Sequence, residues 1–300
     1  MTKKSRSFIA VDILYLTLTI LPILAAIVIR ILTKPLSEGI SITGAQVYFR
    51  IPMPIQDLVI TEAQTNSAFV LLSILGLCLF MTHGLRTKNV LTRQHLVEWV
   101  VEKADRLVIG SMGEHFKGFV PFIAAILALS AFSSLLALVG LFAPTSDINI
   151  TAGWAILVFI LITYYKFKCG PLHYIKAMSD PILLTPLNVI SEVATPVSMA
   201  FRHYGNVLSG SVISVLIASA LQGLSAKLFG WLPSILGEIP FLQVGLPAVL
   251  SIYFDVFSGL LQAYIFAMLT MMYVSGGYDY DEYLERQKRK ERIKAKKNQQ

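Results

Sequence analysis

Six apolar runs, each bounded by charged or turn-forming residues, constrain the fold of this chain more than any other sequence feature. They cover roughly residues 8–32, 67–81, 118–142, 152–167, 183–221 and 246–274, and the short second run is expected to begin a few residues earlier. A helix needs about 20 mainly apolar residues to cross a bilayer, and the runs reach or approach that length. Of the 300 residues 55% are hydrophobic and 14% are charged, against about 25% charged in soluble domains. We therefore predict an all-α membrane protein with six transmembrane helices.

The charged residues predict the topology. A basic segment, MTKKSRS, precedes the first run, which ends at Arg30 and Lys34. This run is longer than the roughly 7–15 apolar residues of a cleavable signal, so a retained helix is favoured over a signal peptide. The formal charge of +7 is concentrated beside the apolar runs and in the tail. That pattern is typical of cytoplasmic flanks and not of nucleic-acid binding, and six spans place both termini in the cytoplasm.

The polar segments between the runs give further expectations. Residues 35–66 contain two short β-favouring pieces, 46–51 and 58–61, so we expect either a two-stranded hairpin or an irregular loop on the outer face. Residues 96–108 place apolar side chains at helical spacing between charges, which predicts an amphipathic helix on the cytoplasmic membrane surface. His83, His95 and His115 fall in this polar region and are expected to be solvated. Cys78 and Cys169 have no partner at ligand spacing, so neither a disulfide nor a metal site is predicted.

Arg202 is the leading functional candidate because it is a permanent cation inside the fifth apolar run. Placing an arginine at bilayer depth costs about 2.5–3.5 kcal/mol on insertion scales. An arginine near a helix end can escape that cost by extending to the interface, but this run continues well past Arg202 on both sides. Ser198, Arg202 and Asn206 are spaced four residues apart and share one helix face. The arginine is therefore expected to meet a partner or a water-filled path.

The sixth run carries a second set of polar residues. Asp255, Ser258 and Gln262 lie on one helix face. If the fifth helix runs outward and the sixth inward, Arg202 comes beside Gln262 near the middle of the membrane. Ser211 and Asp255 then share a depth nearer the outside. A carboxylate at that depth suits reversible proton uptake, although a buried Asp255 that only stabilises packing is the alternative.

Three ordered segments resemble one known family. They are PTSDINITAGWAILVF at 144–159, SMAFRHYGNVLSG at 198–210 and LLQAYIFAMLTMMYVS at 260–275. Together with the spans between them they resemble subunit a of the F-type ATP synthase, over about residues 67–275. We expect three regions: an N-terminal helix and outer hairpin or loop (1–66), the subunit a core with ion half-channels (67–275), and a basic cytoplasmic tail (276–300). Transport is not expected to need the tail beyond Tyr283.

The resemblance implies a non-catalytic stator subunit that couples proton translocation to rotation of a ring of c subunits. Its partners would be the c ring, the b-subunit stalk and the lipid bilayer, without cofactor or metal. A long, tilted pair formed by the fifth and sixth helices would face the ring. Arg202 would meet the ring carboxylate, with Asn206 and Gln262 beside it. The remaining site residues implied are Asp255 and Ser211 in the outer half-channel, Glu192 in the inner one, and Ser198 on the Arg202 face.

Two departures from the family pattern stand out. Ser211 stands where many members carry Glu or His, so Asp255 is the only ionisable residue of that pair. His203 follows the arginine where Leu is common, and we expect it to face neighbouring protein or lipid headgroups.

Three other functions remain to be weighed. A sodium-translocating version of the same subunit stays open, because the ion is selected mainly in the ring. An autonomous secondary transporter is disfavoured because the two halves show no duplicated broken-helix pattern. An intramembrane enzyme is disfavoured because the spans lack paired carboxylates or a metal-ligand set. Co-purification with a ring of small hairpin subunits would separate the subunit from both.

Overall fold

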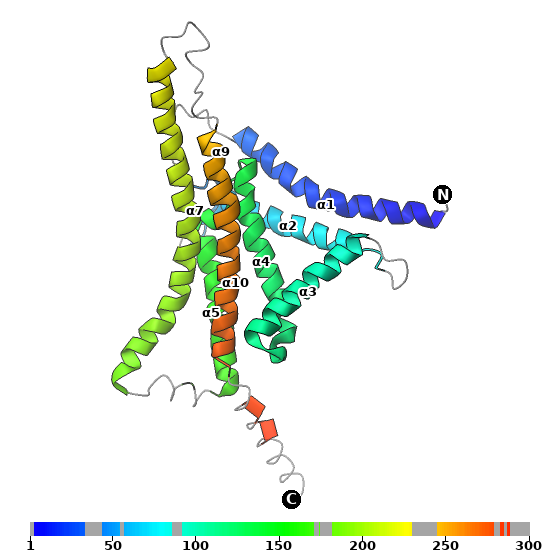
Figure 1. Cartoon of the computed structure of the whole chain (residues 1–300), viewed down its shortest axis with the longest axis vertical. Coiled ribbons are helices and arrows are strands. Elements are labelled where there is room, and N and C mark those ends of the chain that lie inside the picture. Colours follow the sequence, from blue (N-terminus) through cyan, green and yellow to red (C-terminus); the bar gives the residue numbers. More distant parts are fainter. Residues whose placement is uncertain are drawn as a thin grey trace, which may run out of the picture.

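A computed structural model describes residues 3–33, 44–54, 57–85, 92–170, 174, 182–229, 245–278, 283–284 and 287–288. In this part of the chain six helices are long and apolar enough to cross a membrane, as predicted. Figure 1 shows α4, α5, α7 and α10 side by side in a bundle, with the α1–α2 pair steeply inclined to it. The protein is an all-α membrane protein with one small hairpin.

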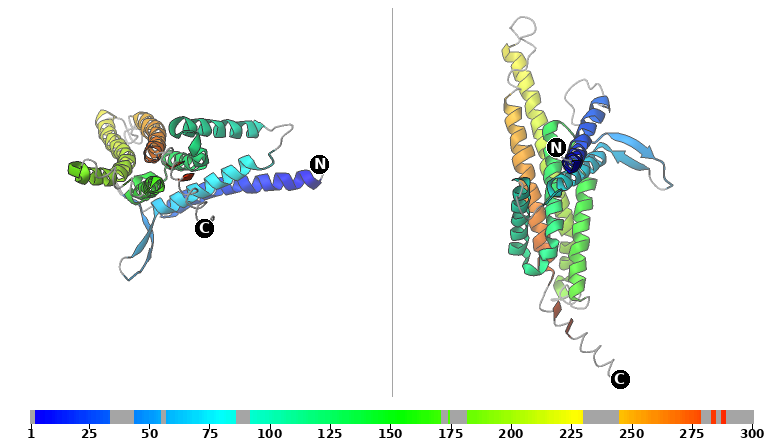
Figure 2. Two further views of the ribbon diagram at one scale, coloured as in Figure 1. Left: turned by 90° about the horizontal axis from the view of Figure 1, so that it is seen from below. Right: turned by 90° about the vertical axis from the view of Figure 1, so that its right-hand side faces the viewer.

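The N-terminal region consists of two long helices joined through a hairpin. Helix α1 spans Lys3–Thr33, strands β1 (Val47–Ile51) and β2 (Leu58–Thr61) pair antiparallel, and α2 spans Glu62–Thr82. The hairpin alternative is therefore confirmed, and Figure 2 shows it projecting away from the bundle. Thr61 and Gln64 form a capping box that starts α2 directly after β2. The Arg30 guanidinium donates to the buried Glu62 carboxylate at 2.8 Å and so joins the end of α1 to the start of α2.

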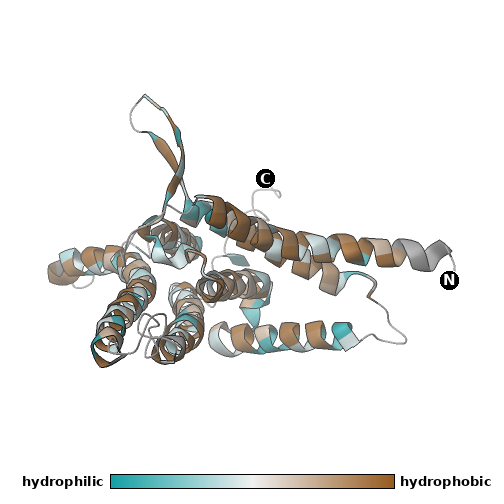
Figure 3. Cartoon of the chain, turned by 90° about the horizontal axis from the view of Figure 1, so that it is seen from above, coloured by the Kyte–Doolittle hydropathy of each residue, from teal (hydrophilic) through white to brown (hydrophobic). Residues whose placement is uncertain are grey.

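Helix α3 (Thr92–Met112) is the expected amphipathic helix. Figure 3 shows hydrophilic and hydrophobic residues alternating along it, whereas α1 is largely hydrophobic. The short η1 (Glu114–Phe119) then turns the chain into α4 (Val120–Leu135), which ends in η2 (Leu136–Val139). Helix α3 packs against α4 and α10 through Val108 and Met112, which belong to the main apolar core.

A tight link joins α4 to α5. The link contains η3 (Pro144–Ser146), and α5 spans Ile148–Cys169. Asp147 caps α5 by accepting a hydrogen bond from the backbone N–H of Asn149 at 2.9 Å. The side chain of Asn66 in α2 donates to the Phe142 carbonyl at 2.9 Å and fastens this link to the α1–α2 pair.

The last two spans differ from their apolar runs, because α7 is longer than its run and the final span is divided into three helical segments. After η4 (Ile182–Leu184), α7 spans Thr185–Phe229, 45 residues with Pro196 inside. It is about 67 Å long at 1.5 Å per residue, roughly twice the hydrocarbon thickness of a bilayer. The fifth apolar run ends near residue 221, but α7 continues to Phe229, and residues 230–244 lie outside the described residues. The final span consists of α9 (Leu246–Ser251), the π-helical η6 (Ile252–Ser258) and α10 (Gly259–Gly276).

The predicted solvation of the three histidines holds for His95 and His115, which are exposed, but is wrong for His83. The His83 Nδ1 lies 2.8 Å from the Asp12 carboxylate, which also accepts from Arg93 at 3.0 Å. The imidazole stacks on Phe8 with ring centroids 4.5 Å apart. This cluster joins α1 to α3, and because Asp12 is 71 positions away from His83, local spacing could not reveal it.

Candidate functional site

Direct contacts fix how α7 lies against the last span. The side chains of Asn206 and Ser258 are hydrogen-bonded at 2.8 Å, and Asn206 Nδ2 also donates to the Ser258 carbonyl at 3.4 Å. Four residues further along α7, a Cβ on Gly210 would lie 2.9 Å from Phe254 Cβ, so the glycine allows the two helices to approach closely there. The two segments are antiparallel, since four residues forward from Asn206 in α7 correspond to four residues backward from Ser258 in the last span.

The same register brings Arg202 level with Gln262, four residues from each partner of the Asn206–Ser258 contact. Gln262, in α10, is 6% exposed. Arg202 is exposed in the isolated chain, like Ser198 one turn before it. Among the described residues, none forms a hydrogen bond or ion pair with the Arg202 guanidinium. A permanent cation thus lies on the open side of α7, beside a polar contact between two spans.

Ser211 and Asp255 occupy neighbouring levels further along the pair. Because Gly210 and Phe254 are in register, Ser211 and Asp255 lie within about 3 Å of each other along the helix axis at 1.5 Å per residue. Ser211 is exposed and Asp255 is half-buried. Asp255 lies inside the π-helical η6, a feature often found at functional sites. No sequence pattern indicates this π-helix, because its residues continue the apolar run.

Glu192 has partners that its sequence position did not reveal. Its carboxylate forms an ion pair with Lys166 Nζ of α5 and accepts a hydrogen bond from the Tyr174 hydroxyl. Burial raises the pKa of Tyr174, and the neighbouring Glu192 carboxylate raises it further, so the phenol remains a donor at neutral pH. Pro196 lies between Glu192 and Arg202 and removes one backbone hydrogen bond of α7.

Much of the exposed surface of α7 and the last span is apolar. Large side chains along α7 and the last span are exposed in the isolated chain: Val193, Val197, Phe201, Ile213 and Leu216 on α7, and Val249, Ile252, Tyr253, Phe257, Leu260, Leu261 and Tyr264 after it. Apolar surface is compatible with either lipid or another membrane protein. An exposed, unpaired arginine is not compatible with lipid at bilayer depth.

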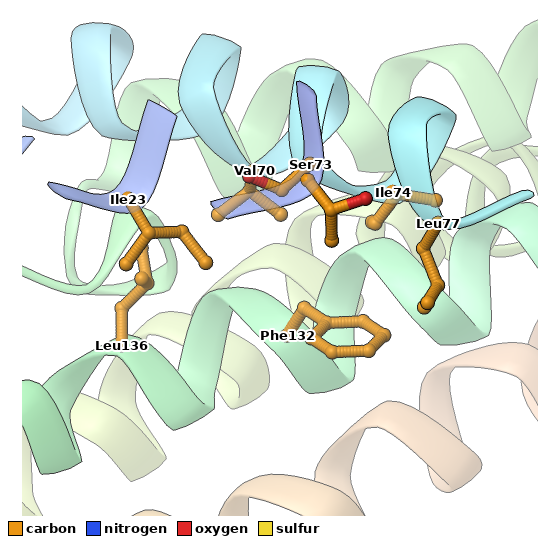
Figure 4. A pocket seen from close by; sticks show the side chains of 8 residues that line it. Ile23, Val70, Ser73, Ile74, Leu77, Phe132 and Leu136 are labelled. Atoms are coloured by element: carbon orange, nitrogen blue, oxygen red, sulfur yellow. The ribbon is translucent and has the colours of Figure 1, made fainter. Parts of the chain in front are cut away.

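Other parts of the molecule offer less chemistry. Among the described residues, no three His, Cys, Asp or Glu side chains are grouped as metal ligands. An apolar pocket of about 60 Å³ lies between α1, α2 and α4 (Figure 4). Its lining is almost entirely aliphatic or aromatic, with Ser73 and Thr19 as the polar members. This pocket lies away from Arg202 and lacks a titratable group.

His203, next to Arg202, points into the bundle. Of the two surroundings expected for it, the structure shows protein: the imidazole is fully buried and contacts α4, α5 and α10. The sequence indicated only that His203 and Arg202 would project in different directions.

Comparison with known proteins gives a consistent result. The family model described as ATP synthase A chain matches residues 66–275. An ATP synthase subunit a from Trichlorobacter lovleyi is 31% identical over 232 residues, which cover 73% of this chain and 90% of that protein. ATP synthase subunit a 1 from Pelobacter propionicus is 30% identical over 75% of this chain and 93% of its own. A Staphylococcus saprophyticus ATP synthase subunit a is 28% identical over 225 residues, which cover 70% of this chain and 88% of that protein.

Proposed function

The chain belongs to the ATP synthase A chain family, and from this premise we propose that it forms two ion half-channels and couples proton passage to rotation of a c-subunit ring. As a member it is a multi-pass, membrane-sector subunit of the ATP synthase. The observation that carries the proposal is the exposed, unpaired Arg202 beside the Asn206–Ser258 contact. It supports a ring docked on the apolar α7–α10 surface, with a ring carboxylate meeting Arg202.

In this mechanism Arg202 separates the two half-channels. A proton from the outside reaches the level of Ser211 and Asp255 and neutralises a ring carboxylate, which can then rotate into lipid. The next carboxylate loses its proton to the inner half-channel and is drawn to Arg202. At 4 Å and an effective dielectric of about 20, such an attraction is about 4 kcal/mol. That is strong enough to exclude a direct leak and weak enough for water in the half-channels to release the pair.

The remaining parts of the proposal concern assembly. The subunit is non-catalytic, contacts the b-subunit stalk as well as the c ring, and has both termini in the cytoplasm. The core region ends near residue 275, but Tyr278 packs on Phe116 and Tyr165, so the first tail residues also contribute to the bundle. The tail that transport does not need therefore begins after Tyr283, whose ring lies 5.5 Å from that of Tyr278.

Glu192→Gln tests the inner half-channel. An amide cannot bind and release a proton, so ATP-driven proton pumping per assembled complex is expected to fall roughly tenfold. That loss is below the 10²–10⁴-fold effect of positioned proton-transfer groups in enzymes, because water can replace a carboxylate in part. The measurement is acidification of inverted membrane vesicles, normalised to the amount of complex.

Lys166→Met is the matched control, because it breaks the same ion pair and keeps the carboxylate. It should retain most of the pumping. If both variants pump equally per assembled complex, Glu192 is only the structural partner of Lys166 and does not belong to the proton path.

A further inference from the structure

His203 is the most completely enclosed polar side chain next to the proposed ion path. Its imidazole is 0% exposed. The Nε2 atom lies 3.1 Å from the Ser130 hydroxyl of α4. The ring meets Trp154 of α5 and Phe266 of α10 edge-on, with centroids 5.8 and 5.7 Å away. Three helices therefore hold one side chain of α7.

This enclosure fixes the direction of Arg202. Successive side chains on a helix are about 100° apart, so an imidazole held between α4, α5 and α10 directs the preceding residue, Arg202, toward the open surface. Asn206, one turn further on, is fixed to Ser258. These two polar contacts, to α4 and to η6, hold α7 against rotation about its own axis. Rotation would move the guanidinium along the surface and withdraw the imidazole from Ser130.

A polar contact holds α7 against rotation better than apolar packing alone. A hydrogen bond requires a definite direction, with strong weakening below about 120°, whereas an aliphatic side chain can slide between neighbours. The need for such a contact is local, because Pro196 interrupts the hydrogen bonding of α7 less than two turns before Arg202. The opposite ring nitrogen, Nδ1, has no hydrogen-bond partner among the described residues. The Nε2 contact is therefore the directional one.

We propose that His203 is a positioning residue that, through its Nε2 contact with Ser130, holds Arg202 in the orientation required for coupling. This inference rests on the proposed function. It predicts a specific defect: the complex assembles and hydrolyses ATP, but Arg202 no longer blocks direct passage between the half-channels. Fewer protons are then pumped per ATP hydrolysed, and passive leak rises.

Three substitutions of His203 test the proposal in the intact complex. Glutamine places an amide near the position of Nε2, asparagine near that of Nδ1, and leucine offers neither. His203→Gln should stay within about twofold of wild type in protons pumped per ATP. His203→Asn and His203→Leu should both pump at least about threefold fewer protons per ATP than wild type. The ratio is measured in vesicles with normal subunit stoichiometry, and a merely structural role would lower the amount of complex without changing the ratio.

Ser130→Ala removes the other partner of the His203–Ser130 hydrogen bond and leaves the sequence of α7 unaltered. It therefore tests the positioning role of His203 even if the His203 variants do not assemble. Its matched control is Ser133→Ala, a buried α4 serine whose hydroxyl has no partner among the described residues. Ser130→Ala should lower the pumping ratio and Ser133→Ala should not. Wild-type ratios in both His203→Leu and Ser130→Ala would overturn the proposal. Failure of the proposed function is distinct, since it would appear as normal coupling in Arg202→Ala.

Discussion

Arg202→Ala is expected to abolish ATP synthesis, to less than about 1% of wild type, in vesicles energised by an imposed proton gradient. Without the cation, nothing attracts a ring carboxylate that has lost its proton to the inner half-channel, and the half-channels are no longer separated. Passive proton leak through the membrane sector should rise for the same reason. Synthesis and leak are measured on the same vesicle preparation, with the amount of assembled complex quantified.

Two further variants sharpen this result. Arg202→Lys should also be severely impaired, because a compact, strongly hydrated ammonium cannot replace a planar guanidinium. Arg106→Ala is the control, since Arg106 is an exposed arginine of α3 that pairs with Glu102 on the surface. It should synthesise ATP normally. Sustained synthesis by Arg202→Ala would remove Arg202 from the coupling mechanism.

Asp255→Asn is expected to reduce proton flux about tenfold or more while the complex assembles. Asn has almost the same size but cannot exchange a proton, and Ser211, the residue at the neighbouring level, cannot ionise. If Asp255 only stabilises packing, the substitution should be nearly neutral. The measurement is passive and ATP-driven proton flux in vesicles with normal subunit stoichiometry. Wild-type flux would exclude Asp255 from the outer path.

A carboxylate placed at position 211 tests whether Ser211 and Asp255 lie at the same depth along one path. Ser211→Glu in the Asp255→Asn background should restore part of the flux, because both positions lie within about one turn along the helix axis and are expected to line one aqueous path. Ser211→Gln in the same background is the control, since it has the same size without the charge. Restoration by Gln as well as Glu would indicate that added volume or polarity, and not proton exchange, restores the flux.

The spans could be predicted from the sequence because burial in a bilayer demands long apolar runs, and the register of α7 against the last span followed from matching polar residues. The predictions were wrong where contacts between distant parts of the chain, or apolar spacing beyond the main run, decide the structure. The fifth apolar run ends near residue 221, but α7 continues to Phe229, with Leu224 and Leu228 extending its apolar spacing. His83 was expected to be solvated because its partner Asp12 is distant in the sequence, and the Lys166 partner of Glu192 is also distant from it.

Within the candidate site, the sequence was enough to select the functional residues but not to predict what surrounds their side chains. A charged residue in an apolar run identified Arg202 without a structure. The enclosure of His203 was not predictable, since it depends on Ser130, Trp154 and Phe266 from three other helices. The π-helix around Asp255 lies where Phe254 packs closely on Gly210. Neither feature has a signature in a single apolar run.

Cysteine cross-linking to the c ring tests the central claim most directly. With Cys78 and Cys169 replaced by serine, single cysteines are placed at Phe201 or Phe257, which are 59% and 58% exposed on the proposed ring surface. A third is placed at Ile20, which is 51% exposed on α1, a helix that lies away from α7 and α10 (Figure 2). Each is tested for disulfide formation with a cysteine beside the ring carboxylate. We predict cross-links from Phe201→Cys and Phe257→Cys and none from Ile20→Cys. Cross-linking from Ile20→Cys alone would contradict a ring docked against Arg202.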